Sequence, residues 1–190
     1  MWTVIFLVLI AAVLLWLIGT YNGLIALKNQ VLNGWKQIDV QLKRRHDLIP
    51  NLVNAVKGAM DFERETMEAV IAARSRAVSA TGVKEVAQAE GMLTQALGKL
   101  FALVEAYPDL KATANITQLQ EELTTTENKI GFARQLYNDV ATQYNTKQMQ
   151  FPANLVAGLA KAVPADLWEI EDAGERAVPA VDLSMKKPSA

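Results

Sequence analysis

The chain has 190 residues, which is enough for a membrane segment and one domain of ordinary size. Its formal net charge of −1 gives no overall attraction to nucleic acid, so no nucleic-acid partner is expected. The chain has no cysteine and a single histidine, which excludes disulfides, thiolate nucleophiles, cysteine-ligated metals and multi-histidine metal sites.

The first 27 residues, MWTVIFLVLIAAVLLWLIGTYNGLIAL, contain no charged side chain. A helix needs about 20 apolar residues to cross about 30 Å of hydrocarbon, and residues 2–20 meet that length. Trp2 and Trp16 lie near its two ends, where interfacial aromatic residues belong. The alternative, a cleaved signal peptide, would have a basic n-region and a small-residue cleavage site, and neither is evident. We therefore predict a transmembrane anchor over residues 1–23.

The charges beside this anchor predict its orientation. No Lys or Arg precedes it, whereas Lys28 and Lys36 follow it closely. Positively charged flanks are retained on the cytoplasmic side. We expect the N-terminus to lie outside and the rest of the chain to lie in the cytoplasm.

Beyond the anchor, apolar residues recur at alternating steps of three and four, the heptad pattern of helices that pack side by side. The pattern covers residues 24–78, 83–107 and 110–150. The motifs SATG, YPD and FP end the three stretches, and short connections favour antiparallel neighbours. We predict an all-α protein in which the transmembrane helix is followed by an antiparallel bundle of long helices over residues 24–150.

Residues 151–190 differ from the bundle because four prolines punctuate them. We predict an irregular C-terminal tail that is partly packed on the bundle, with a short helix, an extended piece and disordered last residues. The dipeptide Tyr-Asn occurs at residues 137–138 and again at 144–145. Seven residues separate the two pairs, so both lie on one face of the helix.

Three charged residues, Arg45, Glu63 and Arg74, interrupt the apolar seam, and others lie beside it. Glu63 and Arg74 are eleven residues apart, and Glu127 and Arg134 are seven apart, so each pair shares a helix face. Because an isolated buried ion is costly, we predict that these four residues form structural ion pairs between helices. The alternative is a polar catalytic or binding core. Bundle di-metal sites need two Glu-x-x-His motifs, so we predict no metal and no cofactor.

The stretch KRRHDLIPNLVNAV, residues 43–56, places a proline inside a helical pattern. One interpretation is that the helix breaks and a new one begins. The other is a continuous helix bent at Pro50, which lacks the N–H that would bond to the His46 carbonyl. The heptad phase continues through the proline, so we predict a continuous, kinked helix with Pro50 as its joint. His46 is interpreted as an ordinary helix residue, with a pH sensor as the alternative.

The basic residues Lys43, Arg44 and Arg45 allow two interpretations. They form a solvated helix face, or they contact an anionic lipid or protein partner. Lys43 lies about 30 Å beyond the membrane exit if the helix stands upright, and screening removes lipid attraction at that distance. Only a helix that lies along the membrane surface would bring them to lipid.

Two groups of motifs point to a family. The stretch QLKRRHDLIPNLV spans residues 41–53, and spaced TEN, AR and two YN motifs lie between residues 126 and 145. Together with the N-terminal anchor, they resemble the LemA family of bacterial membrane proteins. The resemblance implies one transmembrane helix, an antiparallel α-helical bundle and no established catalytic activity. It also implies a single-pass protein of the bacterial plasma (inner) membrane, and magnetosome-associated relatives suggest a role in membrane organisation.

We therefore predict a non-enzymatic, membrane-anchored helical scaffold or interaction protein that contacts the lipid bilayer and forms a homo-oligomer. Two alternatives stay open. One is a regulatory partner of another membrane protein, such as a protease or a sensor kinase. The other is an enzyme with an unrecognised site inside the bundle.

Overall fold

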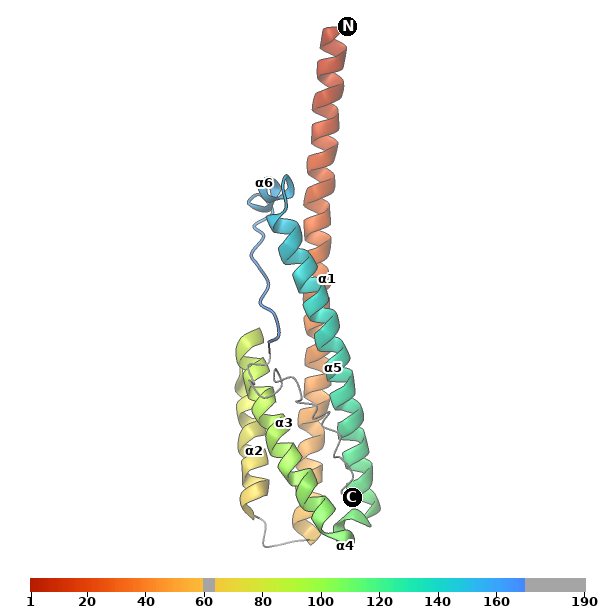
Figure 1. The fold of residues 1–190 in the computed structure, drawn as a ribbon, viewed down its shortest axis with the longest axis vertical. Helices are drawn as coiled ribbons and strands as arrows, with labels where there is room; N and C mark the ends of the chain where they lie inside the picture. Colours follow the sequence, from red (N-terminus) through yellow and green to blue (C-terminus); the bar gives the residue numbers. More distant parts are fainter. Residues whose placement is uncertain (60–63, 170–190) are drawn as a thin grey trace, which may run out of the picture.

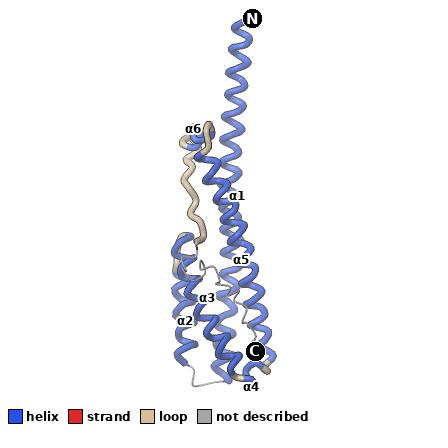
Figure 2. Tube along the Cα trace, in the orientation of Figure 1, coloured by secondary structure: helices blue, strands red, loops and turns tan. Residues whose placement is uncertain are grey.

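A computed structural model describes residues 1–59 and 64–169, and within these ranges it contains helices and no strand (Figures 1 and 2). The prediction of an all-α protein is confirmed. The helices are α1 (Trp2–Ala59), α2 (Arg64–Ser79), α3 (Val83–Ala106), α4 (Pro108–Lys111), α5 (Ala114–Met149) and α6 (Ala153–Ala157).

The four long helices run alternately down and up the long axis of the molecule (Figure 1). Helix α1 packs mainly against α5, and α2 packs mainly against α3. The short α4 connects α3 to α5 at one end of the bundle. At the opposite end, α1 extends well beyond its neighbours, and α6 lies beside it where this extension begins (Figure 1).

Helix α1 runs without interruption through Pro50, so the prediction of a continuous helix is confirmed and a break is excluded. The predicted bend stays a prediction. Residues on both sides of the proline share one buried face: Leu42, Ile49 and Val56 are each at most 4% exposed. The helix is maintained because the seven-residue spacing buries this face on both sides of the proline, from Leu24 to Val56.

One sequence prediction needs correction, since the apolar stretch 24–78 is two helices rather than one. Helix α1 ends at Ala59 and α2 begins at Arg64. The heptad phase nevertheless carries over, because Val56 before the connection and Met67 after it are buried in the same core cluster. Because both helices bury their apolar face in one core, the apolar pattern does not show where α1 ends and α2 begins.

The core consists of two clusters stacked along the bundle. The lower cluster joins the end of α1 to α2, α3 and the start of α5, with Leu52, Val70 and Leu100 at its centre. The upper cluster joins α1 to α5 and to the chain after α6. Here Gly34 of α1 lies directly against Tyr137 of α5, since a Cβ at position 34 would be in van der Waals contact with Tyr137 Cα at 3.4 Å.

Candidate functional site

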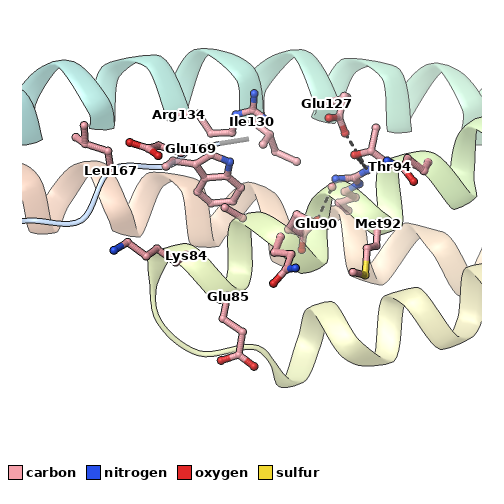
Figure 3. A pocket seen from close by; sticks show the side chains of 16 residues that line it. Lys84, Glu85, Glu90, Met92, Thr94, Glu127, Ile130, Arg134, Leu167 and Glu169 are labelled. Carbon is pink, nitrogen blue, oxygen red and sulfur yellow. Dashed lines mark hydrogen bonds and ion pairs between the residues drawn. The ribbon is translucent and has the colours of Figure 1, made fainter. Parts of the chain in front are cut away.

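Arg45 lies at the centre of a buried polar cluster where α1, α3 and α5 meet. Its side chain is almost fully enclosed. Arg45 Nη1 donates to Glu90 Oε2 at 2.9 Å, and Nη2 donates to Thr94 Oγ1 at 2.7 Å and lies 3.2 Å from Glu127 Oε2. Glu90 and Thr94 come from α3 and Glu127 comes from α5 (Figure 3). One guanidinium group therefore connects three helices.

Glu90 is the other buried ion of this cluster, and it binds two neighbours on α1. Its Oε2 accepts from Arg45, and its Oε1 lies 2.6 Å from His46 Nε2. An ionised carboxylate only accepts hydrogen bonds, so the histidine nitrogen is the donor. The negative charge of Glu90 compensates the positive charge of Arg45, as a buried pair requires. Adjacent residues of α1 thus hold both oxygens of one carboxylate.

Arg74 of α2 compensates for the hydrogen bond that Pro50 cannot make. The proline has no N–H, so the His46 carbonyl one turn earlier lacks its partner within the helix. Arg74 Nε donates to this oxygen at 2.7 Å. The proline therefore allows a cation on a neighbouring helix to bond to the backbone of α1, which aligns α1 with α2.

The four residues predicted to form ion pairs have different environments. Glu127 pairs between helices, with Arg45. Among the residues that the structure describes, Arg74 donates to the His46 carbonyl and not to a carboxylate. Arg134 stacks on Trp168, with its guanidinium carbon 5.6 Å from the ring centroid. Glu63 lies outside the described residues. The pairing of Glu127 with a cation on another helix is seen, whereas carboxylate partners for Arg74 and Arg134 stay a prediction, since Glu63 is among the residues that the structure does not describe.

The basic triplet does not behave as one surface. Lys43 and Arg44 are exposed, and Arg44 Nη2 lies 3.8 Å from Glu122 Oε2. Arg45 is 2% exposed, so it is withdrawn as a contact for lipid or a partner. A helical period of 3.6 residues turns the third residue of such a run toward the core. Contact of Lys43 and Arg44 with a partner or lipid stays a prediction.

Sequence reasoning missed Glu90. The signal was present, because Glu90 follows Val86 by four residues and precedes Leu93 by three, and both are seam positions. A charge at such a position is buried when the helix packs, so it requires a partner of opposite charge. Arg45 and Glu90 are two such charges of opposite sign, and the structure shows that they form a pair.

The two Tyr-Asn pairs hold the chain that follows α6. Asn145 Nδ2 donates to the Ala165 carbonyl and its Oδ1 accepts from the Ala165 N–H, each at 2.8 Å. Asn138 bonds in the same way to both backbone groups of Trp168, at 2.9 and 2.8 Å. Seven residues of helix rise about 10.5 Å, and three residues of extended chain span about 10 Å. This match explains the seven-residue repeat.

Tyr137 adds a third contact to the same segment. Its hydroxyl donates to the Asp166 carbonyl at 2.7 Å. Burial, followed by the nearby negative charge of Asp166, raises the pKa of the Tyr137 hydroxyl above its ordinary value of 10.0. Its ring packs edge-on against Trp35 at 5.7 Å, and Trp35 also contacts the Trp168 ring at 6.0 Å. The extended chain is therefore anchored by aromatic packing as well as by hydrogen bonds.

A groove of about 780 Å³ runs between α3 and α5 beside these groups (Figure 3). Arg45 and Trp168 line it, and Arg45 Nε and Trp168 Nε1 are buried without a hydrogen-bond partner in the described part of the chain. The described residues contain no group of three His, Asp or Glu side chains that could hold a metal ion. The contacts of the cluster join α1 to α3 and α5, an arrangement that can fix the register of the three helices.

The helical bundle and its apolar N-terminal extension together are those of a membrane-associated all-α protein. Helix α1 contains a segment long and apolar enough to cross a membrane, and little of that segment is buried within the chain. The chain belongs to the LemA family, whose model matches residues 34–183. The family resemblance seen in the sequence is confirmed.

Curated relatives are consistent with this assignment. The chain is 30% identical over 142 residues to Protein LemA of Metamycoplasma hominis, an alignment that covers 74% of this chain and 64% of that protein. It is 23% identical over 185 residues to Magnetosome protein MamQ 2 of Paramagnetospirillum magneticum, covering 84% of this chain and 68% of the relative. Magnetosome protein MamQ of Magnetospirillum gryphiswaldense is 22% identical over the same length.

Proposed function

We propose that this chain is a non-enzymatic scaffold or interaction protein, anchored by α1 in the bacterial plasma membrane and self-associating there. The supporting observation is the form of α1. One continuous helix begins as an apolar segment that is little buried within the described chain and ends as a helix of the bundle, packed mainly against α5. Such a helix transmits position and orientation from the membrane directly to the bundle.

The outer face of the α1–α5 pair supports self-association. A groove of about 450 Å³ runs between the two helices, with Val40, Phe132 and Leu136 exposed along it. The same groove is lined by Gln41, whose Oε1 is buried without a hydrogen-bond partner in the described chain. Exposed apolar residues that gather along a groove mark a contact surface. A second copy would present the same face at the same distance from the membrane, because its own α1 is anchored in the same bilayer.

Crosslinking tests self-association cleanly because the chain has no cysteine. Val40→Cys places a thiol on the proposed face, and Ile71→Cys on the outside of α2 is the matched control. We expect oxidation of full-length protein in membranes to give a disulfide-linked dimer with Val40→Cys and not with Ile71→Cys. A monomer with both variants, at every protein density, would contradict self-association.

The same experiment addresses the alternative of a regulatory partner. A bifunctional crosslinker attached at Val40→Cys that captures only a different membrane protein would favour that alternative over a homo-oligomer. The orientation, with the N-terminus outside and the bundle cytoplasmic, rests on Lys28 and Lys36 after the anchor. We expect a membrane-impermeant maleimide to label Trp2→Cys and not Ile71→Cys in intact cells without an outer membrane.

A further inference from the structure

A group of exposed apolar side chains gathers at the end of the bundle from which α1 extends. We call residues 149–163 the apolar tip. Its exposed members are Met149, Phe151, Leu155, Leu159 and Val163, each at least 66% exposed. Single exposed apolar residues are ordinary on a protein surface, but five large ones within one fifteen-residue segment are an unusual concentration.

The apolar tip has a defined shape because its opposite side is packed. Ala153, Val156 and Ala160 are buried against the bundle, and Ala160 belongs to the same core cluster as Leu24 of α1. The segment therefore buries two alanines and one valine, and it exposes its methionine, its phenylalanine and its two leucines. This is the reverse of the order that a segment surrounded by water would favour.

The apolar tip lies at the height where the apolar run of α1 ends. The antiparallel helices α1 and α5 are in register with Gly34 beside Tyr137. Both helices rise by about 1.5 Å per residue, so Met149, twelve residues after Tyr137, is level with Asn22, twelve residues before Gly34. Figure 1 agrees, with α6 beside α1 at the base of its extension. If residues 2–20 cross the hydrocarbon, this height corresponds to the headgroup region.

The charges around the apolar tip fit an anionic surface. Residues 140–165 contain no Asp or Glu, and their two charged residues are the exposed Lys147 and Lys161. Asp139 and Asp166 are the acidic residues that flank this range. Apolar side chains accompanied by lysines are the combination that binds the interface of membranes with anionic lipids.

We propose that the apolar tip is a second membrane-contact site, which rests in the interfacial region of the same bilayer that α1 crosses. The proposal goes beyond the scaffold function and depends only on α1 being the anchor. Two attachments on one rigid bundle fix its tilt and rotation relative to the membrane. The α1–α5 face used for self-association is then presented in one orientation.

Lipid-borne quenchers test this in the full-length chain. An environment-sensitive fluorophore is attached to Leu155→Cys in the apolar tip, with Ile71→Cys on α2 as the exposed control and Leu9→Cys in the anchor as the deep control. The proteins are reconstituted into phosphatidylcholine–phosphatidylglycerol vesicles that carry doxyl-labelled lipid. We expect quenching of the Leu155 label to exceed that of the Ile71 label at least about threefold, with the Leu9 label quenched as well.

The controls separate this inference from the anchor itself. Quenching at Leu9 with no more quenching at Leu155 than at Ile71 would overturn the membrane contact and leave the anchor intact. No quenching at Leu9 would overturn both. A Leu155 label that is shielded from iodide in the water but not quenched by lipid would identify a protein contact and refute the lipid contact.

A second variant tests the apolar surface directly. Phe151→Ser, made in the Leu155→Cys background, removes an exposed ring and leaves the buried side of the tip unchanged. We expect lipid quenching to fall by about half while the circular dichroism of the bundle stays the same. Unchanged quenching with Phe151→Ser would mean that the exposed side chains do not hold the tip at the membrane.

Discussion

Replacing Arg45 with methionine should destabilise the bundle by several kcal/mol, although the side chain has similar length. The Arg45 and Glu90 side chains are 3% and 4% exposed, and their closest atoms are 2.9 Å apart. Without Arg45, Glu90 would remain buried with only the His46 hydrogen bond. Removal of one partner from such a pair costs about 3–5 kcal/mol, because the remaining charge is left uncompensated. Thr94 would also lose the donor to its hydroxyl.

Arg44 provides a control at the adjacent position. Its side chain is 50% exposed and its partner Glu122 lies 3.8 Å away, so Arg44→Met should cost less than about 1 kcal/mol. Urea unfolding of the full chain in mild detergent, followed by tryptophan fluorescence, measures both variants. A double variant, Arg45→Met with Glu90→Gln, should recover about 1–3 kcal/mol relative to the sum of the single changes. Equal unfolding free energies for Arg44→Met and Arg45→Met would refute the reasoning.

Three further changes test other parts of the structure. Arg74→Met should lower the free energy of unfolding by about 1.5–3 kcal/mol, because the His46 carbonyl loses a charged donor. In a Pro50→Ala background the loss should be smaller, because residue 50 then supplies its own N–H to this carbonyl. An equal loss in both backgrounds would show that Arg74 and Pro50 are not coupled. Asn138→Ala should remove two hydrogen bonds to Trp168 and weaken the attachment of the extended chain by about 1–3 kcal/mol. Proteolysis of the chain after α6 should therefore become faster. An unchanged rate would show that Asn138 does not hold this chain in place. Because its pKa is raised in the folded state, Tyr137 contributes stability that is fully present below about pH 10 and is lost as the pH rises further; Tyr137→Phe should flatten this alkaline loss, measured by urea unfolding at pH 8 to 11, and an unchanged slope would assign the loss to other groups.

The sequence predicted the long helices because heptad spacing reports directly which face of a helix is buried. It did not reveal the connection between α1 and α2, since both helices bury the same seam in one core. It identified Arg45 and Arg74 as charges on that seam. It could not assign their partners, because a seam charge shows that a partner is needed and does not show whether that partner is a carboxylate or a backbone carbonyl.

The sequence by itself determined the apolar N-terminal segment, the all-α class, the continuity of the helix through Pro50 and the common face of the two Tyr-Asn pairs. These features follow from composition and helical period, which depend only on neighbouring residues. Only the tertiary structure decided that Arg45 binds Glu90 and Glu127, that Arg74 bonds to the His46 carbonyl and that the paired asparagines hold the extended chain. It also placed the apolar tip level with the end of the apolar N-terminal segment. These are contacts between segments far apart in sequence, and they exist only once the antiparallel packing sets which residues lie at the same height.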